Sequence, residues 1–210
     1  MKIIPAILVQ SEAEFLQQTK AIEGAADYIH IDITDGQFVS ETTWSDPEVV
    51  RTNLKINCEL HLMVQNPLAI IKKWRDVPQI KRILFHVEAT LDIEETIDAI
   101  HAQGWQATVV LNPETSTESI ESVAQKLDGV LGMTIHPGAQ GRAFMPEVLP
   151  KLMALKQKYP DLLTQVDGGV NAQTLLQIKT AGIDCVCVGS AIFGHGDPAE
   201  NLANLKKLIA

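Results

Sequence analysis

Apolar and polar positions recur with two different periods along this chain of 210 residues, one typical of strands and one typical of helices. In the run Tyr28–Thr34, Ile29, Ile31 and Ile33 alternate with polar residues, and this period of two is typical of a strand. Amphipathic stretches typical of helices separate such runs. The predicted strands cover residues 3–9, 28–34, 57–64, 82–88, 106–112, 129–135, 163–168 and 184–189. The predicted helices cover residues 12–24, 47–54, 67–74, 92–103, 117–126, 146–158, 172–181 and 198–209.

These strand–helix pairs repeat about every 25 residues, which is typical of a small (β/α)8 barrel. We therefore expect an α/β fold, a single-domain TIM barrel over residues 1–210, since no linker or composition shift divides the chain. The alternative is a doubly wound open sheet, which usually carries a glycine-rich turn after its first strand. Residues 9–12 read Val-Gln-Ser-Glu at that place and favour the barrel.

Composition narrows the choice of partners. The net charge of −9 disfavours nucleic acid and anionic membranes, so an anionic ligand would need local backbone amides to hold it. No apolar stretch is long enough to span a membrane, and the N-terminus reads as a first strand rather than a signal peptide. Three cysteines without a CxxC motif argue against a disulfide framework and suit the cytoplasm.

Four polar side chains are expected at one end of the barrel. His30 and Asp32 share a face of the second strand, His61 lies on the third, and Asp167 ends the seventh. Active sites of such barrels form at the carboxyl ends of the strands. Two imidazoles and two carboxylates suit Zn²⁺, Fe²⁺, Mn²⁺ or Co²⁺, so the sequence predicts one divalent metal ion here.

The two carboxylates also suit acid–base chemistry. Asp32 and Asp167 come from strands well apart around the barrel, which places one on each side of a bound substrate. Together with a Lewis acid they suit removal of a proton beside a carbonyl and its return on the other face, through an enediolate. The predicted reaction is inversion at a carbon next to a carbonyl.

Glycines follow the last two strands and suit a phosphate site. Gly168-Gly169 and Gly189-Ser190 allow backbone N–H groups to approach an anion closely. The segment 137–142 after the sixth strand has the length and glycines of a lid, and Arg142 within it is a candidate phosphate ligand.

Several of these residues also have purely structural interpretations. His86 and Glu88 fit a structural pair as well as a site, Met63 and Met133 fit core packing, and each glycine pair alone fits a turn. The gathering of four metal-ligand side chains at one end of one predicted barrel favours a real site.

The same residues lie in segments that resemble the ribulose-phosphate 3-epimerase family. The matches run in order along nearly the whole chain, over residues 30–38, 61–67, 85–89, 111–115, 133–138, 166–169 and 188–193. The resemblance implies a barrel of the ribulose-phosphate-binding type that interconverts D-ribulose 5-phosphate and D-xylulose 5-phosphate.

Residue roles follow from this resemblance. It implies Zn²⁺ or Fe²⁺ at the four ligands, Asp32 and Asp167 as the acid–base pair, and Met63 and Met133 beside the intermediate. The residues it implies in binding the substrate and its phosphate are His61, Gly138, Gly141, Gly168, Gly169, Gly189 and Ser190. We also expect a homo-oligomer.

Three positions depart from the family pattern. Ala6 stands where the family usually has serine, Thr34 where it has methionine, and Arg142 changes the lid. Because these positions alter pocket polarity, volume and charge, a hexulose 6-phosphate epimerase remains an alternative. A sugar-phosphate-binding protein without turnover is another. A related lyase or decarboxylase is disfavoured, because Asp32 is not followed by a lysine two residues later.

Overall fold

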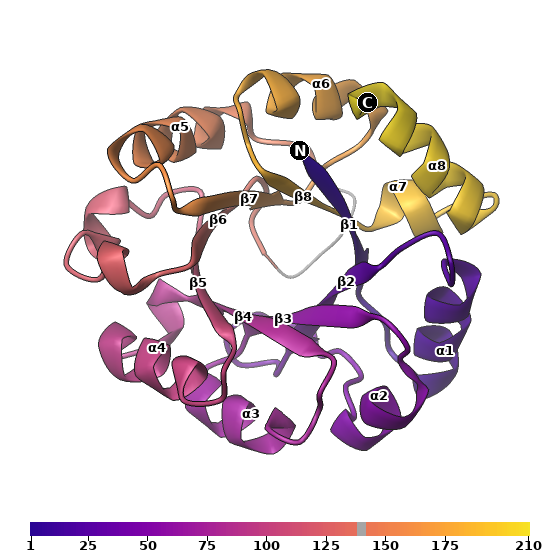
Figure 1. The fold of residues 1–210 in the computed structure, drawn as a ribbon, viewed down its shortest axis with the longest axis horizontal. Coiled ribbons are helices and arrows are strands. Elements are labelled where there is room, and N and C mark those ends of the chain that lie inside the picture. The colour runs from indigo at the N-terminus through magenta and orange to yellow at the C-terminus, as the bar shows by residue number, and fades with distance from the viewer. Residues whose placement is uncertain (138–141) are drawn as a thin grey trace.

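The computed structural model describes residues 1–137 and 142–210 and shows a closed barrel of parallel strands (Figure 1). The strands are β1 (Lys2–Ile7), β2 (Tyr28–Thr34), β3 (Asn57–Met63), β4 (Ile80–His86), β5 (Gln106–Leu111), β6 (Gly129–Met133), β7 (Leu163–Asp167) and β8 (Cys185–Val188). Each strand pairs with its neighbour in sequence, and Ile3 of β1 pairs with Val186 of β8 to close the ring. The predicted (β/α)8 barrel is confirmed, and the open sheet is excluded.

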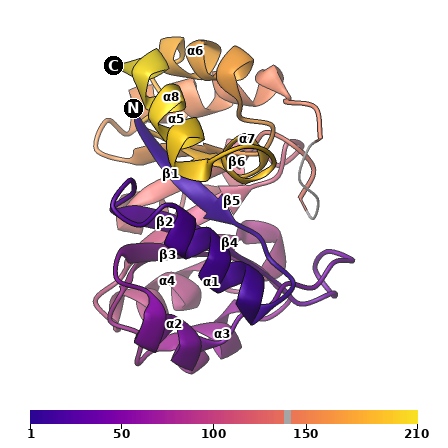
Figure 2. The same cartoon turned by 90° about the vertical axis from the view of Figure 1, so that its right-hand side faces the viewer.

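Helices surround the strands on the outside of the barrel (Figure 1). They are α1 (Glu12–Ala21), α2 (Pro47–Asn53), α3 (Pro67–Trp74), α4 (Ile93–His101), α5 (Leu149–Lys158), α6 (Ala172–Thr180), α7 (Ser190–Phe193) and α8 (Pro198–Ile209). The two termini lie near each other (Figure 2). Among the described residues, no helix has both the length and the apolar character that crossing a membrane requires.

The predicted helix over residues 117–126 is wrong. Two short 3₁₀ helices stand there, Thr117–Ile120 and Ala124–Lys126. Ser116 accepts from the backbone N–H of Glu118, and Ser119 donates back to the Ser116 carbonyl. Such local hydrogen bonds compete with an α-helix, and the buried Ile120 and Val123 have the three-residue spacing of a 3₁₀ helix.

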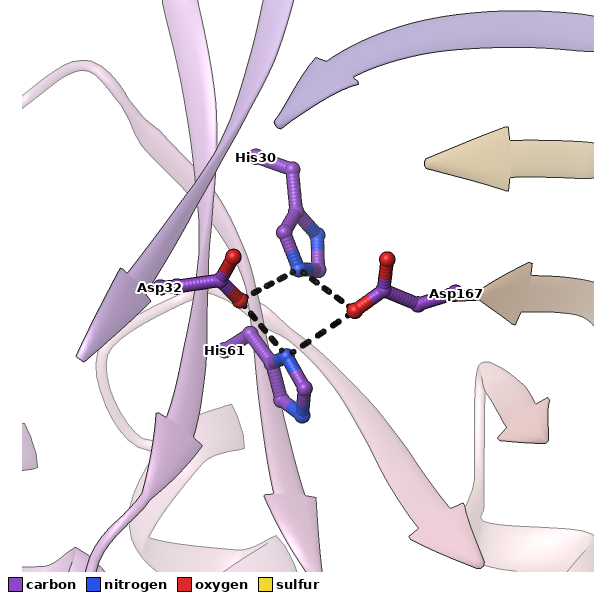
Figure 3. Close-up of side chains that lie close together, drawn as sticks. All are labelled: His30, Asp32, His61 and Asp167. Atoms are coloured by element: carbon purple, nitrogen blue, oxygen red, sulfur yellow. Dashed lines mark hydrogen bonds and ion pairs between the residues drawn. The ribbon is translucent and has the colours of Figure 1, made fainter. Parts of the chain in front are cut away.

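Side chains alternate along each strand between two buried regions, the core between strands and helices and the interior of the barrel. Ile29, Ile31 and Ile33 face outward and pack in the large core between strands and helices. His30 and Asp32, on the other face of β2, are also buried and face the barrel axis (Figure 3). The barrel interior is therefore polar on this side, and its charged groups need partners.

Candidate active site and metal centre

A cavity opens at the carboxyl ends of the strands, with the two aspartates at its floor. The residues that line it come from β1, β2, β3, β6, β7, β8 and the loops that follow: Ala6, Leu8, Asp32, Met63, Met133, Ile135, Asp167, Gly168, Gly169, Val170, Cys187, Gly189 and Ser190. This is the end where sequence analysis placed the site.

The structure brings the four predicted metal ligands together (Figure 3). Asp32 Oδ1 lies 2.9 Å from His61 Nδ1 and 3.2 Å from His30 Nε2. Asp167 Oδ2 lies 3.7 Å from His61 Nδ1 and 4.0 Å from His30 Nε2. All four donor atoms lie within 4.8 Å of one another.

The strand register explains this convergence. Asp32 on β2 pairs with His61 on β3, one layer above the pair His30 and Glu59. Asp167 reaches the same atoms from β7, across the barrel (Figure 3). Two imidazole nitrogens and two carboxylate oxygens at this spacing fit a divalent cation such as Zn²⁺ or Fe²⁺.

The two carboxylates have different electrostatic surroundings. Burial alone would raise the pKa of Asp32, but His30 and His61 hold it well below its usual range. Burial raises the pKa of Asp167 to about 6, and the charge of Asp32 adds to this rise. Two carboxyl groups with opposite pKa shifts in one pocket are typical of an acid–base pair.

Below this cluster lies a buried polar network that sequence analysis missed. Glu59 Oε1 lies 2.7 Å from His30 Nδ1, while Arg82 donates to Glu59 Oε2 over 3.1 Å and Gln165 donates to Glu59 Oε1 over 2.5 Å. A carboxylate at the far nitrogen of a metal-ligating histidine fixes the ring and its tautomer. The period of two could have found these residues, because Glu59 shares a strand face with His61.

His86 contacts the cluster on its other side, and Glu88 lies next to His86. His86 Nε2 lies 3.0 Å from His61 Nε2, and Glu88 Oε2 lies 3.4 Å from His86 Nδ1. Burial is the main cause that lowers the pKa of His86 to about 4. The pair predicted from sequence is therefore present, and it touches a metal-ligand candidate.

The two glycine pairs line the cavity beside Asp167. Gly168 has φ of +109° and Gly169 has φ of +67°. A Cβ on Gly168 would lie 2.4 Å from Ile135 Cγ1, and one on Gly169 would lie 2.9 Å from the Phe144 backbone. Glycine is thus required at both positions by conformation and by space.

The remaining residues predicted for the pocket or lid lie in different places. Ala6, Met63 and Met133 line the cavity, whereas Thr34 and Arg142 are not among its lining residues. Thr34 is held beneath the loop after β2, where its N–H donates to Thr43 Oγ1, and Arg142 donates to the carbonyl of His136 in its own loop. The predicted ligands Gly138 and Gly141 lie outside the described residues.

Comparison with known proteins identifies the family of the chain. The model of the ribulose-phosphate 3 epimerase family matches residues 2–193. The chain belongs to this family. A ribulose-phosphate 3-epimerase of Bacillus subtilis is 37% identical over 218 residues, covering 98% of each protein. The cytoplasmic isoform of rice (Oryza sativa) is 34% identical over 215 residues, covering 99% of this chain and 94% of the relative.

Membership of the ribulose-phosphate 3-epimerase family places the chain among the isomerases. Solved structures agree on the fold alone. The 3-hexulose-6-phosphate synthase of Salmonella typhimurium superposes with a TM-score of 0.76 at 16% identity, covering 100% of this chain and 98% of that one.

Proposed function

We propose that this protein epimerises D-ribulose 5-phosphate and D-xylulose 5-phosphate at C3, with a divalent metal ion and two aspartates. The observation that carries the proposal is the meeting of Asp32 on β2 and Asp167 on β7 at one cavity, around the same two imidazoles. The names of the curated relatives support the substrate.

The two carboxylates supply the proton transfers. One takes the C3 proton from its face of the bound ketose, and the other, in its protonated form, returns a proton to the opposite face. The result is inversion at C3 through an enediolate of the sugar. A positioned acid or base contributes about 10²–10⁴-fold to such a rate.

The metal would be held by His30, Asp32, His61 and Asp167. Zn²⁺ and Fe²⁺ are the preferred candidates for this ion, and Mn²⁺ and Co²⁺ are further candidates. When bound, the ion supplies a Lewis acid that stabilises negative charge on the carbonyl and neighbouring hydroxyl oxygens. His30, Asp32 and His61 are buried and Asp167 is only partly exposed, which limits the access of bulk water to the reacting carbon.

The phosphate would lie at Gly168, Gly169, Gly189 and Ser190, which line the cavity wall beside Asp167. Backbone N–H groups are the appropriate ligands here, because the protein carries a net charge of −9. Lid contacts from Gly138 and Gly141 remain a prediction from sequence.

A second candidate is the same epimerisation of a hexulose 6-phosphate. Ala6 lines the cavity with only a methyl group and leaves space on that wall. A binding protein without turnover is a third candidate, but binding alone needs no opposed pair of aspartates.

Turnover tests on matched substrates separate these candidates. Purified protein with Zn²⁺, Fe²⁺, Mn²⁺ or Co²⁺ is given ribulose 5-phosphate or a hexulose 6-phosphate, and kcat/KM is measured for each. The proposal predicts a higher kcat/KM for the pentulose. A preference for the hexulose supports the second candidate, and no turnover of either with metal bound supports the third.

Three further proposals concern the whole protein. We propose that the barrel of residues 1–210 is one catalytic domain, that it forms homo-oligomers, and that it works in the cytoplasm. The last is supported by the name of the rice relative and by three buried cysteines without disulfides.

A further inference from the structure

His86 joins the proposed metal centre to a carboxylate outside it. It ends β4, is fully buried, and lies nearly parallel to the ring of His61, with ring centroids 5.1 Å apart and an interplanar angle of 21°. Phe38 covers His86, with ring centroids 4.7 Å apart. The Nε2 atoms of the two histidines face each other at 3.0 Å, and Glu88 Oε2 lies 3.4 Å from the other nitrogen of His86.

Metal binding at His61 Nδ1 would decide where the ring hydrogens lie. Two nitrogens at 3.0 Å share one hydrogen, so one of them donates and the other accepts. If His61 Nδ1 presents its lone pair to a metal, His61 Nε2 carries the hydrogen and donates it to His86 Nε2. His86 then carries its own hydrogen on Nδ1, which is the nitrogen that faces Glu88.

Glu88 is held as a pure acceptor. Its Oε1 accepts from the backbone N–H of Asn112 over 3.1 Å and from the hydroxyl of Thr115. Lys151 anchors that loop by donating to the carbonyls of Asn112 and Thr115 at 2.8 and 3.1 Å. The second oxygen of Glu88 therefore faces His86 Nδ1 at 3.4 Å. This buried nitrogen has no hydrogen-bond partner among the described residues, so a small shortening of the gap would let Glu88 accept its N–H.

We propose that Glu88, acting through His86, is a positioning residue that fixes His61 in the tautomer whose Nδ1 is free to bind metal. The inference rests on the proposed metal centre and deepens it. It gives His61 the same kind of support that Glu59 gives His30 directly. Loss of such a hydrogen-bonding partner behind a metal-ligating histidine typically lowers metal affinity 10- to 100-fold.

The isosteric variant Glu88→Gln tests the proposal, because it reverses the direction of hydrogen-bond donation along His61, His86 and residue 88. The backbone N–H of Asn112 only donates, so the new amide turns its oxygen there and its NH₂ group toward His86 Nδ1. That nitrogen must then accept, which moves the hydrogens of both histidines and leaves His61 Nδ1 protonated. The Kd for Zn²⁺, measured by competition with a chromophoric chelator, is expected to rise about 10- to 100-fold.

Asp128→Asn is the matched control. Asp128 also accepts from a histidine, His101, at 2.9 Å and from a backbone N–H, that of Ala107, at 2.8 Å. This pair lies at the surface and makes no contact with the four proposed ligands. The Zn²⁺ Kd of the Asp128→Asn variant is expected to equal that of the wild type.

The outcomes are distinct. A Zn²⁺ Kd in Glu88→Gln equal to the wild-type value would overturn the proposal. If the variant does not fold, ¹⁵N NMR of the imidazoles in the Zn²⁺-loaded wild type decides instead. Hydrogen on His86 Nδ1 and none on Nε2 is expected, and the reverse would overturn the proposal. Neither readout uses turnover, so failure here differs from failure of the epimerase proposal.

Discussion

Asp32 and Asp167 belong to strands that are not neighbours in the barrel, yet both direct an oxygen at the same nitrogen of His61 (Figure 3). Their donor oxygens lie within 4.8 Å of each other. Two carboxylates at this separation, one buried and one partly exposed, repel each other unless a cation or a proton lies between them. The pair thus combines the two requirements of the proposed reaction, a metal site and opposed acid–base groups.

Asp167→Asn is expected to reduce turnover by at least about 10²-fold, because it removes one of the two proton-transfer groups. Activity on ribulose 5-phosphate is measured at saturating Zn²⁺, with circular dichroism to confirm folding. Asp161→Asn, at an exposed site, serves as the control. Full activity in Asp167→Asn would rule out its proposed role.

Removal of metal is expected to abolish activity and lower the Tm. Zn²⁺ at 100 times its Kd stabilises the folded protein by about 2.7 kcal/mol. His61→Ala should lose this stabilisation, whereas His101→Ala, on the helix surface, should keep it. Equal Zn²⁺-dependent shifts of Tm in the two variants would contradict the proposed ligand set.

Gly168→Ala is expected to be destabilised by strain and overlap together. The positive φ costs about 1–2 kcal/mol, and the overlap with Ile135 adds about 1–3 kcal/mol. Gly182→Ala is the matched control, because Gly182 has φ of +73° and open space around its Cβ position. Urea unfolding measures both stabilities. Only Gly168→Ala should also raise KM for the sugar phosphate, and an unchanged KM there would count against the phosphate site.

Glu59→Leu is expected to cost about 3–5 kcal/mol, because it leaves Arg82 buried without its carboxylate. Urea unfolding measures the loss. The double variant Glu59→Leu/Arg82→Leu should recover part of it, since it removes the unpaired charge as well. A single variant as stable as the wild type would show that the pair is not a structural element.

Asp184 is expected to make stability depend on pH. Its burial raises its pKa, but hydrogen bonds from Lys156 and Thr164 outweigh this and lower the pKa in the folded protein. A group with a depressed folded pKa contributes stability above its unfolded pKa, about 4, and loses it as pH falls further. Asp184→Asn should therefore cost about 1 kcal/mol at pH 7 and little at pH 3 in chemical unfolding. A difference that does not depend on pH would refute this.

The sequence predicted the barrel and the central cluster because both follow from strand periodicity. His30 and Asp32 alternate with isoleucines, so their common face was readable without a structure. The network at Glu59 obeys the same rule but was missed, since a single glutamate beside Cys58 carries no sign of its distant partners Arg82 and Gln165.

Other features depend on interactions that local sequence does not encode. The helix predicted at residues 117–126 is replaced by 3₁₀ turns because serine side chains hydrogen-bond to nearby backbone. The guanidinium of Arg142 donates to the carbonyl of His136, a contact that sequence position did not indicate, and its role at a phosphate stays a prediction. Such side-chain directions depend on loop geometry rather than on residue type.

Isotope incorporation during the reaction in D₂O tests the central claim most directly. The protein is loaded with Zn²⁺ and given ribulose 5-phosphate, and C3 of substrate and product is examined by NMR at early times. Two opposed aspartates predict xylulose 5-phosphate that carries deuterium at C3, while the recovered ribulose 5-phosphate keeps its protium. Product that retains protium at C3, or no product with metal bound, would contradict the account.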